Sequence, residues 1–111
     1  MKRTEENKIM KAAIEKYGAD GQLGVVIEEC SELIQAICKY QRAKANVKTS
    51  QRDLDIRIDA LIEEAADVQI MLDQLTMMRS EWDPEIYCDL FATVREEKLK
   101  RLEKRVGKGG K

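Results

Sequence analysis

Two pairs of acidic side chains carry most of the chemical information in this sequence of 111 residues. Each pair is spaced three residues apart, Glu29 with Glu32 and Glu64 with Asp67. Residues at this spacing lie side by side on one face of a helix, so two carboxylates can hold a cation together. Glu64 also falls within the apolar arc of its helix, where an ionised carboxylate needs a cation or a proton. The pattern predicts a metal site; the alternative is an ion pair between Glu64 and a Lys or Arg of another helix.

The types of ligand narrow the choice of metal. The sequence contains no His, which excludes His-ligated zinc and the Ser-His-Asp and Cys-His nucleophile systems. Four carboxylates favour a hard, oxygen-preferring ion, so we expect Mg²⁺, with Mn²⁺ as a substitute. Because Mg²⁺ in proteins usually shares its coordination sphere with substrate phosphates, the acidic pairs also predict a phosphate-bearing ligand.

A basic segment near the C-terminus fits such a ligand. Residues 94–111 contain eight Lys or Arg and three Glu, whereas the whole chain has 20 basic and 21 acidic residues. We expect Lys98, Arg101 and Arg105 to contact phosphate oxygens; the alternative is a solvated helix face. The net charge of −1 argues against a general nucleic-acid-binding protein, so no nucleic-acid partner is predicted.

Good helix formers fill almost all of the chain and predict an all-α fold, similar to a four-helix bundle. The expected helices span about residues 2–17, 21–44 and 50–78, and a fourth starts at Asp83-Pro84-Glu85 and ends at Val106. Asp20 is expected to cap the second helix, and Ser50, with Asp53 three residues later, to cap the third. We predict a single domain over residues 1–106 and a flexible basic tail over residues 107–111.

Cysteine usage and hydrophobicity bear on the cellular location. The three cysteines form no C-x-x-C pair and are odd in number, which is typical of reduced thiols. No segment approaches the roughly 20 apolar residues that cross a bilayer, and the N-terminal residues are too polar for a signal peptide. We therefore expect a cytoplasmic protein that binds no membrane.

Two motifs in order give the sequence a recognisable pattern. Residues 28–33 read E-E-C-S-E-L, residues 63–67 read E-E-A-A-D, and about 30 residues separate them. With the basic last helix, this pattern resembles the MazG-like all-α nucleoside triphosphate pyrophosphohydrolases and their dUTPase and dCTPase relatives. The resemblance covers nearly the whole chain. It implies a MazG-type fold assembled as a homodimer or a dimer of dimers, and hydrolysis of a nucleoside triphosphate to a monophosphate and pyrophosphate.

The resemblance also implies roles for individual residues. Carried over by motif position, Glu29, Glu32, Glu64 and Asp67 coordinate Mg²⁺, and one carboxylate positions the attacking water. Glu28 and Glu63 match the first Glu of each motif, without an assigned role. The implied substrate-binding residues are Lys39, Lys98, Arg101, Arg105 and Gln22, with Lys98 also implied in catalysis.

The C-terminal motif of some relatives, Lys-x-x-x-Asn-x-x-Arg-Tyr-Pro, is matched only in part. Lys98 and Arg105 match it, but Leu102 replaces the Asn and Val106-Gly107 replaces Tyr-Pro, so no base or sugar preference is carried over. Gln22 and Tyr40 are candidates for a base pocket, with ordinary helix packing as the alternative.

Other functions are compatible with the same residues. One is a narrower activity on the same fold, such as hydrolysis of dUTP, dCTP or phosphoribosyl-ATP. Another is a non-catalytic helical module that dimerises or docks on a partner, with the acidic pairs in interhelical ion pairs. A surplus of apolar residues predicts a subunit interface or, alternatively, an adaptable Met-rich core; these are Ile70, Met71, Met77, Met78, Trp82 and Phe91.

Overall fold

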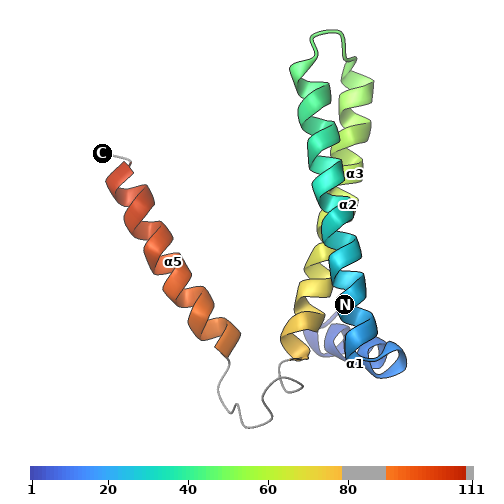
Figure 1. The fold of residues 1–111 in the computed structure, drawn as a ribbon, viewed down its shortest axis with the longest axis vertical. Coiled ribbons are helices and arrows are strands. Elements are labelled where there is room, and N and C mark those ends of the chain that lie inside the picture. The colour runs from blue at the N-terminus through green and yellow to red at the C-terminus, as the bar shows by residue number, and fades with distance from the viewer. Residues whose placement is uncertain (79–89, 110–111) are drawn as a thin grey trace. The chain divides into compact units, whose positions relative to one another are not determined.

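The computed structural model describes residues 1–78 and 90–109, and nearly all of them are helical (Figure 1). The helices are α1 (Arg3–Tyr17), α2 (Ala19–Ala45), α3 (Gln51–Met77) and α5 (Leu90–Gly109). No strand occurs in these residues, which confirms the predicted all-α class. The chain divides into two compact units, Met1–Met78 and Arg79–Lys111.

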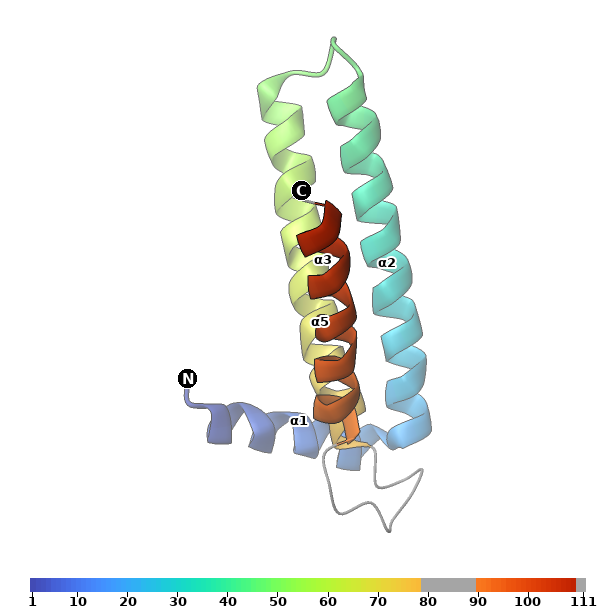
Figure 2. The same ribbon diagram turned by 90° about the vertical axis from the view of Figure 1, so that its left-hand side faces the viewer.

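The first unit is built on a long antiparallel hairpin of α2 and α3 (Figures 1 and 2). Each arm has 27 residues and is therefore about 40 Å long. The helix α1 lies across the end of the hairpin where α2 begins and α3 ends, and it contacts both arms. Side chains that face each other across the two arms are thus positioned by the register of a single helix pair.

The ends of the helices follow local capping chemistry. Ser50 Oγ accepts a hydrogen bond of 3.1 Å from the Asp53 N–H, which confirms the predicted start of α3. Gly18 alone separates α1 from α2, with φ of +81°, a conformation that strains any residue with a Cβ. Because α2 already begins at Ala19, Asp20 lies in its first turn and the predicted Asp20 cap is wrong. Its charge still interacts favourably with the positive end of the helix dipole.

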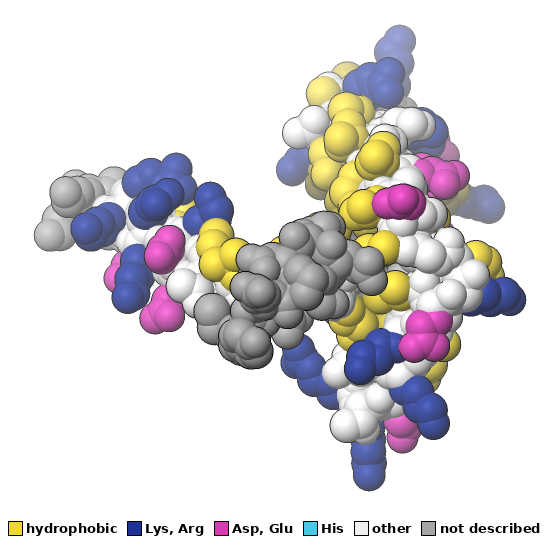
Figure 3. Space-filling view, turned by 60° about the horizontal axis from the view of Figure 1, so that its bottom comes forward, with side chains coloured by type: hydrophobic (Ala, Val, Ile, Leu, Met, Phe, Trp, Pro, Cys, Tyr) yellow, Lys and Arg dark blue, Asp and Glu magenta, His cyan; other side chains and the backbone are white. Residues whose placement is uncertain are grey.

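The core of the first unit is small and rich in methionine. Its buried apolar residues, among those described, are Met10, Ala36, Val68, Met71 and Met78. Two of the surplus apolar residues named from the sequence, Met71 and Met78, therefore lie in a Met-rich core, as one of the two alternatives predicts. Ile70 is 49% exposed, and Ile27 and Ile34 on α2 are 69% and 62% exposed. Apolar side chains thus remain open on the surface (Figure 3).

In the second unit, the described residues form the helix α5. This helix ends at Gly109, whereas the sequence predicts a helix that ends at Val106. The predicted helix start at residues 83–85 lies outside the described residues, as does Trp82 of the apolar surplus. None of the described helices is long and apolar enough to cross a membrane.

Candidate metal centre and the adjoining groove

Three of the four predicted metal ligands come together between α2 and α3. Glu29, Glu64 and Asp67 each offer a carboxylate oxygen, and these oxygens lie within 4.8 Å of one another. Glu29 comes from α2, whereas Glu64 and Asp67 lie one turn apart on α3. Because its ligands come from both helices, the site depends on the pairing of the two arms. We call these three residues the carboxylate cluster.

Glu32, the fourth predicted ligand, adjoins the carboxylate cluster. It lies one turn after Glu29 on α2, and the negative charge of its carboxylate is among the causes that raise the pKa of Glu64. The side chain of Glu32 is exposed to solvent.

The cluster carries negative charge that the protein does not neutralise. Glu29 Oε2 and Glu64 Oε2 are buried and have no hydrogen-bond partner. The only ion pair found among the described residues joins Lys100 to Glu96 on α5, so the alternative of an ion pair to Glu64 finds no partner in this part of the chain. Buried polar atoms usually have a partner in folded proteins, and these two oxygens are therefore candidates for binding a ligand.

The pKa values of Glu29 and Glu64 reflect this environment. Burial raises the pKa of Glu29 above its ordinary value of 4.5, and the charges of Glu32 and Asp67 raise it further. Burial also raises the pKa of Glu64, and the negative charges of Glu32 and Asp67 add to the effect. Desolvation and repulsion between like charges both favour the protonated form. A bound cation would reverse the balance.

These raised pKa values predict that the protein without metal loses stability as the pH rises. Both glutamates bind protons more tightly in the folded than in the unfolded chain, so their stabilising contribution is complete below pH 4.5 and is lost as the pH passes through the raised pKa values. Thermal unfolding in EDTA, followed by circular dichroism, should give a higher midpoint at about pH 5 than at about pH 8. The double variant E29Q/E64Q should lose most of this dependence. If the unfolding midpoint of the variant depends on pH as strongly as that of the wild type, the pH dependence does not arise from Glu29 and Glu64.

A groove of about 190 Å³ runs along the hairpin beside the cluster. Its charged lining consists of Glu32 and Glu64 on the acidic side and Lys39 and Arg57 on the basic side. The structure therefore places Lys39, a predicted phosphate ligand, next to the predicted metal site. Arg57, which is not among the residues predicted from the sequence, lines the same groove from α3.

Gln22, predicted to bind substrate, is instead buried between the helices. Its amide donates a hydrogen bond of 2.6 Å to Gln74 Oε1, and both side chains are buried. Gln74 in turn donates to Met71 Sδ. This pairing satisfies Gln22 inside the protein and matches the alternative of helix packing. Tyr40 is half-buried, with the Lys44 ammonium 5.9 Å from its ring centre.

The basic residues predicted near the C-terminus share one face of α5. Lys98, Arg101 and Arg105 line a shallow surface of the second unit together with Lys104. All four side chains are exposed, as expected both for phosphate-binding residues and for a solvated helix face. This surface belongs to the second unit and is a separate candidate for anion binding.

Comparison of the chain with models of protein families, with curated proteins and with solved structures found no match.

Proposed function

We propose that this protein is a divalent-metal-dependent nucleoside triphosphate pyrophosphohydrolase of the MazG-like type. The observation that carries the proposal is the carboxylate cluster, in which buried oxygens of Glu29 and Glu64 lack any protein partner. The cluster is formed by the two motifs on which the resemblance rests. A protein that used these acids only to join its helices would pair them with Lys or Arg, and the described residues contain no such pair.

The residues present fit Mg²⁺. All the donors are carboxylate oxygens, which suit hard cations, and three of them lie within 4.8 Å of one another. Glu29, Glu64 and Asp67 would hold the ion, with Glu32 beside them. Bound Mg²⁺ supplies charge neutralisation for phosphate oxygens and activates water for attack, and Mn²⁺ is the expected substitute.

The protein's own side chains complete the proposed chemistry. Lys39 lines the groove beside the cluster, where its ammonium can neutralise phosphate oxygens and hold the substrate in place. Glu32 is exposed and lines the same groove as Glu64, so it is suited to orient a water molecule. Lys98, Arg101 and Arg105 are proposed to bind phosphates as well, with Lys98 assisting the reaction.

Assembly with a second copy of the chain is part of the proposal. The hairpin leaves large aliphatic side chains in water, among them Ile27, Ile34 and Ile62. Exposed apolar patches of this kind often mark protein interfaces, and most soluble oligomers are symmetric assemblies of one chain. We propose a homodimer or a dimer of dimers.

A product assay tests the proposed function. We expect the purified protein with Mg²⁺ to convert at least one common ribo- or deoxyribonucleoside triphosphate, or dUTP, to its monophosphate and pyrophosphate, resolved by ion-exchange chromatography. EDTA should stop the reaction. Release of diphosphate and orthophosphate would refute cleavage between the α and β phosphates. Failure to hydrolyse any of these nucleotides would favour the non-catalytic helical module.

A further inference from the structure

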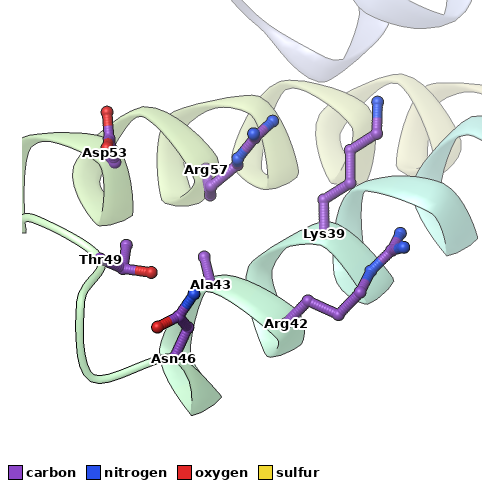
Figure 4. Close-up of a pocket in the computed structure, with 7 residues that line it drawn as sticks. All are labelled: Lys39, Arg42, Ala43, Asn46, Thr49, Asp53 and Arg57. Atoms are coloured by element: carbon purple, nitrogen blue, oxygen red, sulfur yellow. The ribbon is translucent and has the colours of Figure 1, made fainter.

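A second, wider groove lies farther along the hairpin toward the loop that joins its arms. It measures about 540 Å³, and its lining residues are Lys39, Arg42, Ala43, Asn46, Thr49, Asp53 and Arg57 (Figure 4). Lys39 and Arg57 also line the smaller groove beside the carboxylate cluster. The two grooves therefore adjoin each other, and we call the wider one the basic groove.

The basic groove carries excess positive charge. Its lining contains three cationic side chains and one acidic side chain, Asp53. Within residues 1–78 and 90–109, no ion pair involves Lys39, Arg42 or Arg57. Arg42 Nε donates a hydrogen bond of 3.4 Å to the Cys38 carbonyl on its own helix, and its terminal guanidinium nitrogens form no hydrogen bond within the described chain. Such an arrangement can bind an anion with charge-assisted hydrogen bonds.

The spacing along the helices places the cations in line with the carboxylates. Lys39 follows Glu32 by seven residues on α2, and Arg57 precedes Glu64 by seven residues on α3. Because the arms run antiparallel, both steps lead in the same direction, toward the loop. Seven residues correspond to two turns, or about 10.5 Å. Lys39 and Arg57 point toward the same side of the hairpin (Figure 4), so one elongated anion can contact both.

We infer that the basic groove binds the terminal pyrophosphate portion of a nucleoside triphosphate. The substrate then lies along the hairpin, with its terminal phosphates toward the loop and the bond to be cleaved near the carboxylate cluster. The identity of the ligand rests on the proposed function, whereas the anion site rests on the groove itself. Since Lys39, Arg42 and Arg57 contact the departing pyrophosphate, they select for the number of phosphates and not for the base.

The test is isothermal titration calorimetry of the full chain with inorganic pyrophosphate in metal-free buffer. The double variant K39A/R57A should bind pyrophosphate at least about tenfold more weakly than the wild type, because it loses two charge-assisted contacts. The matched control K48A/R52A removes one Lys and one Arg from exposed positions of the same hairpin outside the groove. Its affinity should stay within about twofold of the wild type, since only long-range, salt-screened charge is lost.

Several outcomes would overturn the inference. They are the absence of pyrophosphate binding by the wild type, unchanged binding by K39A/R57A, and equal weakening in both double variants. Circular dichroism of both variants should match the wild type, because all four substituted side chains are exposed. As a second check, Arg57→Lys keeps the charge and should retain more affinity than Arg57→Ala.

Failure of the inference can be distinguished from failure of the proposed function. If nucleotides are hydrolysed but K39A/R57A binds pyrophosphate normally, the function stands and the basic groove has no role in it. If no nucleotide is hydrolysed but the two double variants behave as expected, the groove is an anion site and the proposed reaction is wrong. The variant E64Q should bind pyrophosphate at least as well as the wild type without metal, since it removes a negative charge from the adjoining site.

Discussion

The substitution Glu64→Gln should reduce Mg²⁺-dependent nucleotide hydrolysis by about 10³-fold while leaving the helical fold intact. Glu64 offers a carboxylate oxygen within 4.8 Å of those of Glu29 and Asp67, and its Oε2 is buried without a hydrogen-bond partner. Gln keeps the shape of the side chain but removes the negative charge that would hold a cation. Steady-state kinetics with the nucleotide that is turned over best would measure the loss.

Two controls separate this effect from a loss of folding. Asp73→Asn makes the same change from carboxylate to amide at an exposed position of α3 and should retain wild-type activity. Without metal, Glu64→Gln should unfold at the same temperature as the wild type or a higher one, because it removes a charge that burial and its neighbours disfavour. Retained activity in Glu64→Gln would contradict the assignment of the metal site.

Addition of Mg²⁺ should raise the unfolding temperature of the wild-type protein. A ligand that binds only the folded state stabilises it by about 2.7 kcal/mol when its concentration is 100 times the Kd. For a domain of this size, that corresponds to an increase of about 10 °C in Tm. The increase should diminish at low pH, where protons compete for the carboxylates whose pKa values are raised. Differential scanning calorimetry with and without Mg²⁺ would measure it.

The specificity of this stabilisation is checked with a variant and with salt. E29Q/E64Q should show little response to Mg²⁺, and NaCl at the same ionic strength should not reproduce the effect in the wild type. If Mg²⁺ raises the unfolding temperature of the wild type and of the variant equally, Mg²⁺ binds the protein somewhere other than the carboxylate cluster. Such a result would also support the alternative of a non-catalytic helical module.

Much of the secondary structure could be predicted because it depends on local chemistry. Ser50 caps α3 where the sequence predicts it, and Gly18 separates α1 from α2. The exact start of α2 was missed, since Gly18 lets the chain turn within a single residue. Asp20 therefore lies inside the helix.

The candidate site was predictable only in part for a related reason. The spacing within each helix places Glu64 beside Asp67, but the approach of Glu29 to both depends on the register between α2 and α3. Spacing alone cannot supply that register, which was implied only by the resemblance. Arg57 was missed for the same reason, because its alignment with Lys39 appears only when the arms are paired.

Burial of polar groups was the least predictable property. Gln22 has a side chain suited to a ligand pocket, and the sequence does not reveal that Gln74, 52 residues later, pairs with it in the core. Conversely, the apolar side chains of Ile27 and Ile34 remain exposed because a hairpin of two helices has little interior. Both cases depend on packing between helices, whose partners the hydrophobic pattern of one helix does not specify.

The position of a bound metal ion is the most direct measurement of the central claim. Crystals of the protein grown or soaked with Mn²⁺ and measured near the manganese absorption edge would locate the ion by its anomalous signal. We expect a peak among the carboxylates of Glu29, Glu64 and Asp67, with Glu32 adjoining it. A peak elsewhere in the protein would contradict the proposed metal centre. So would the absence of a peak at the carboxylate cluster, if its side chains are ordered and the Mn²⁺ concentration is one that stabilises the protein.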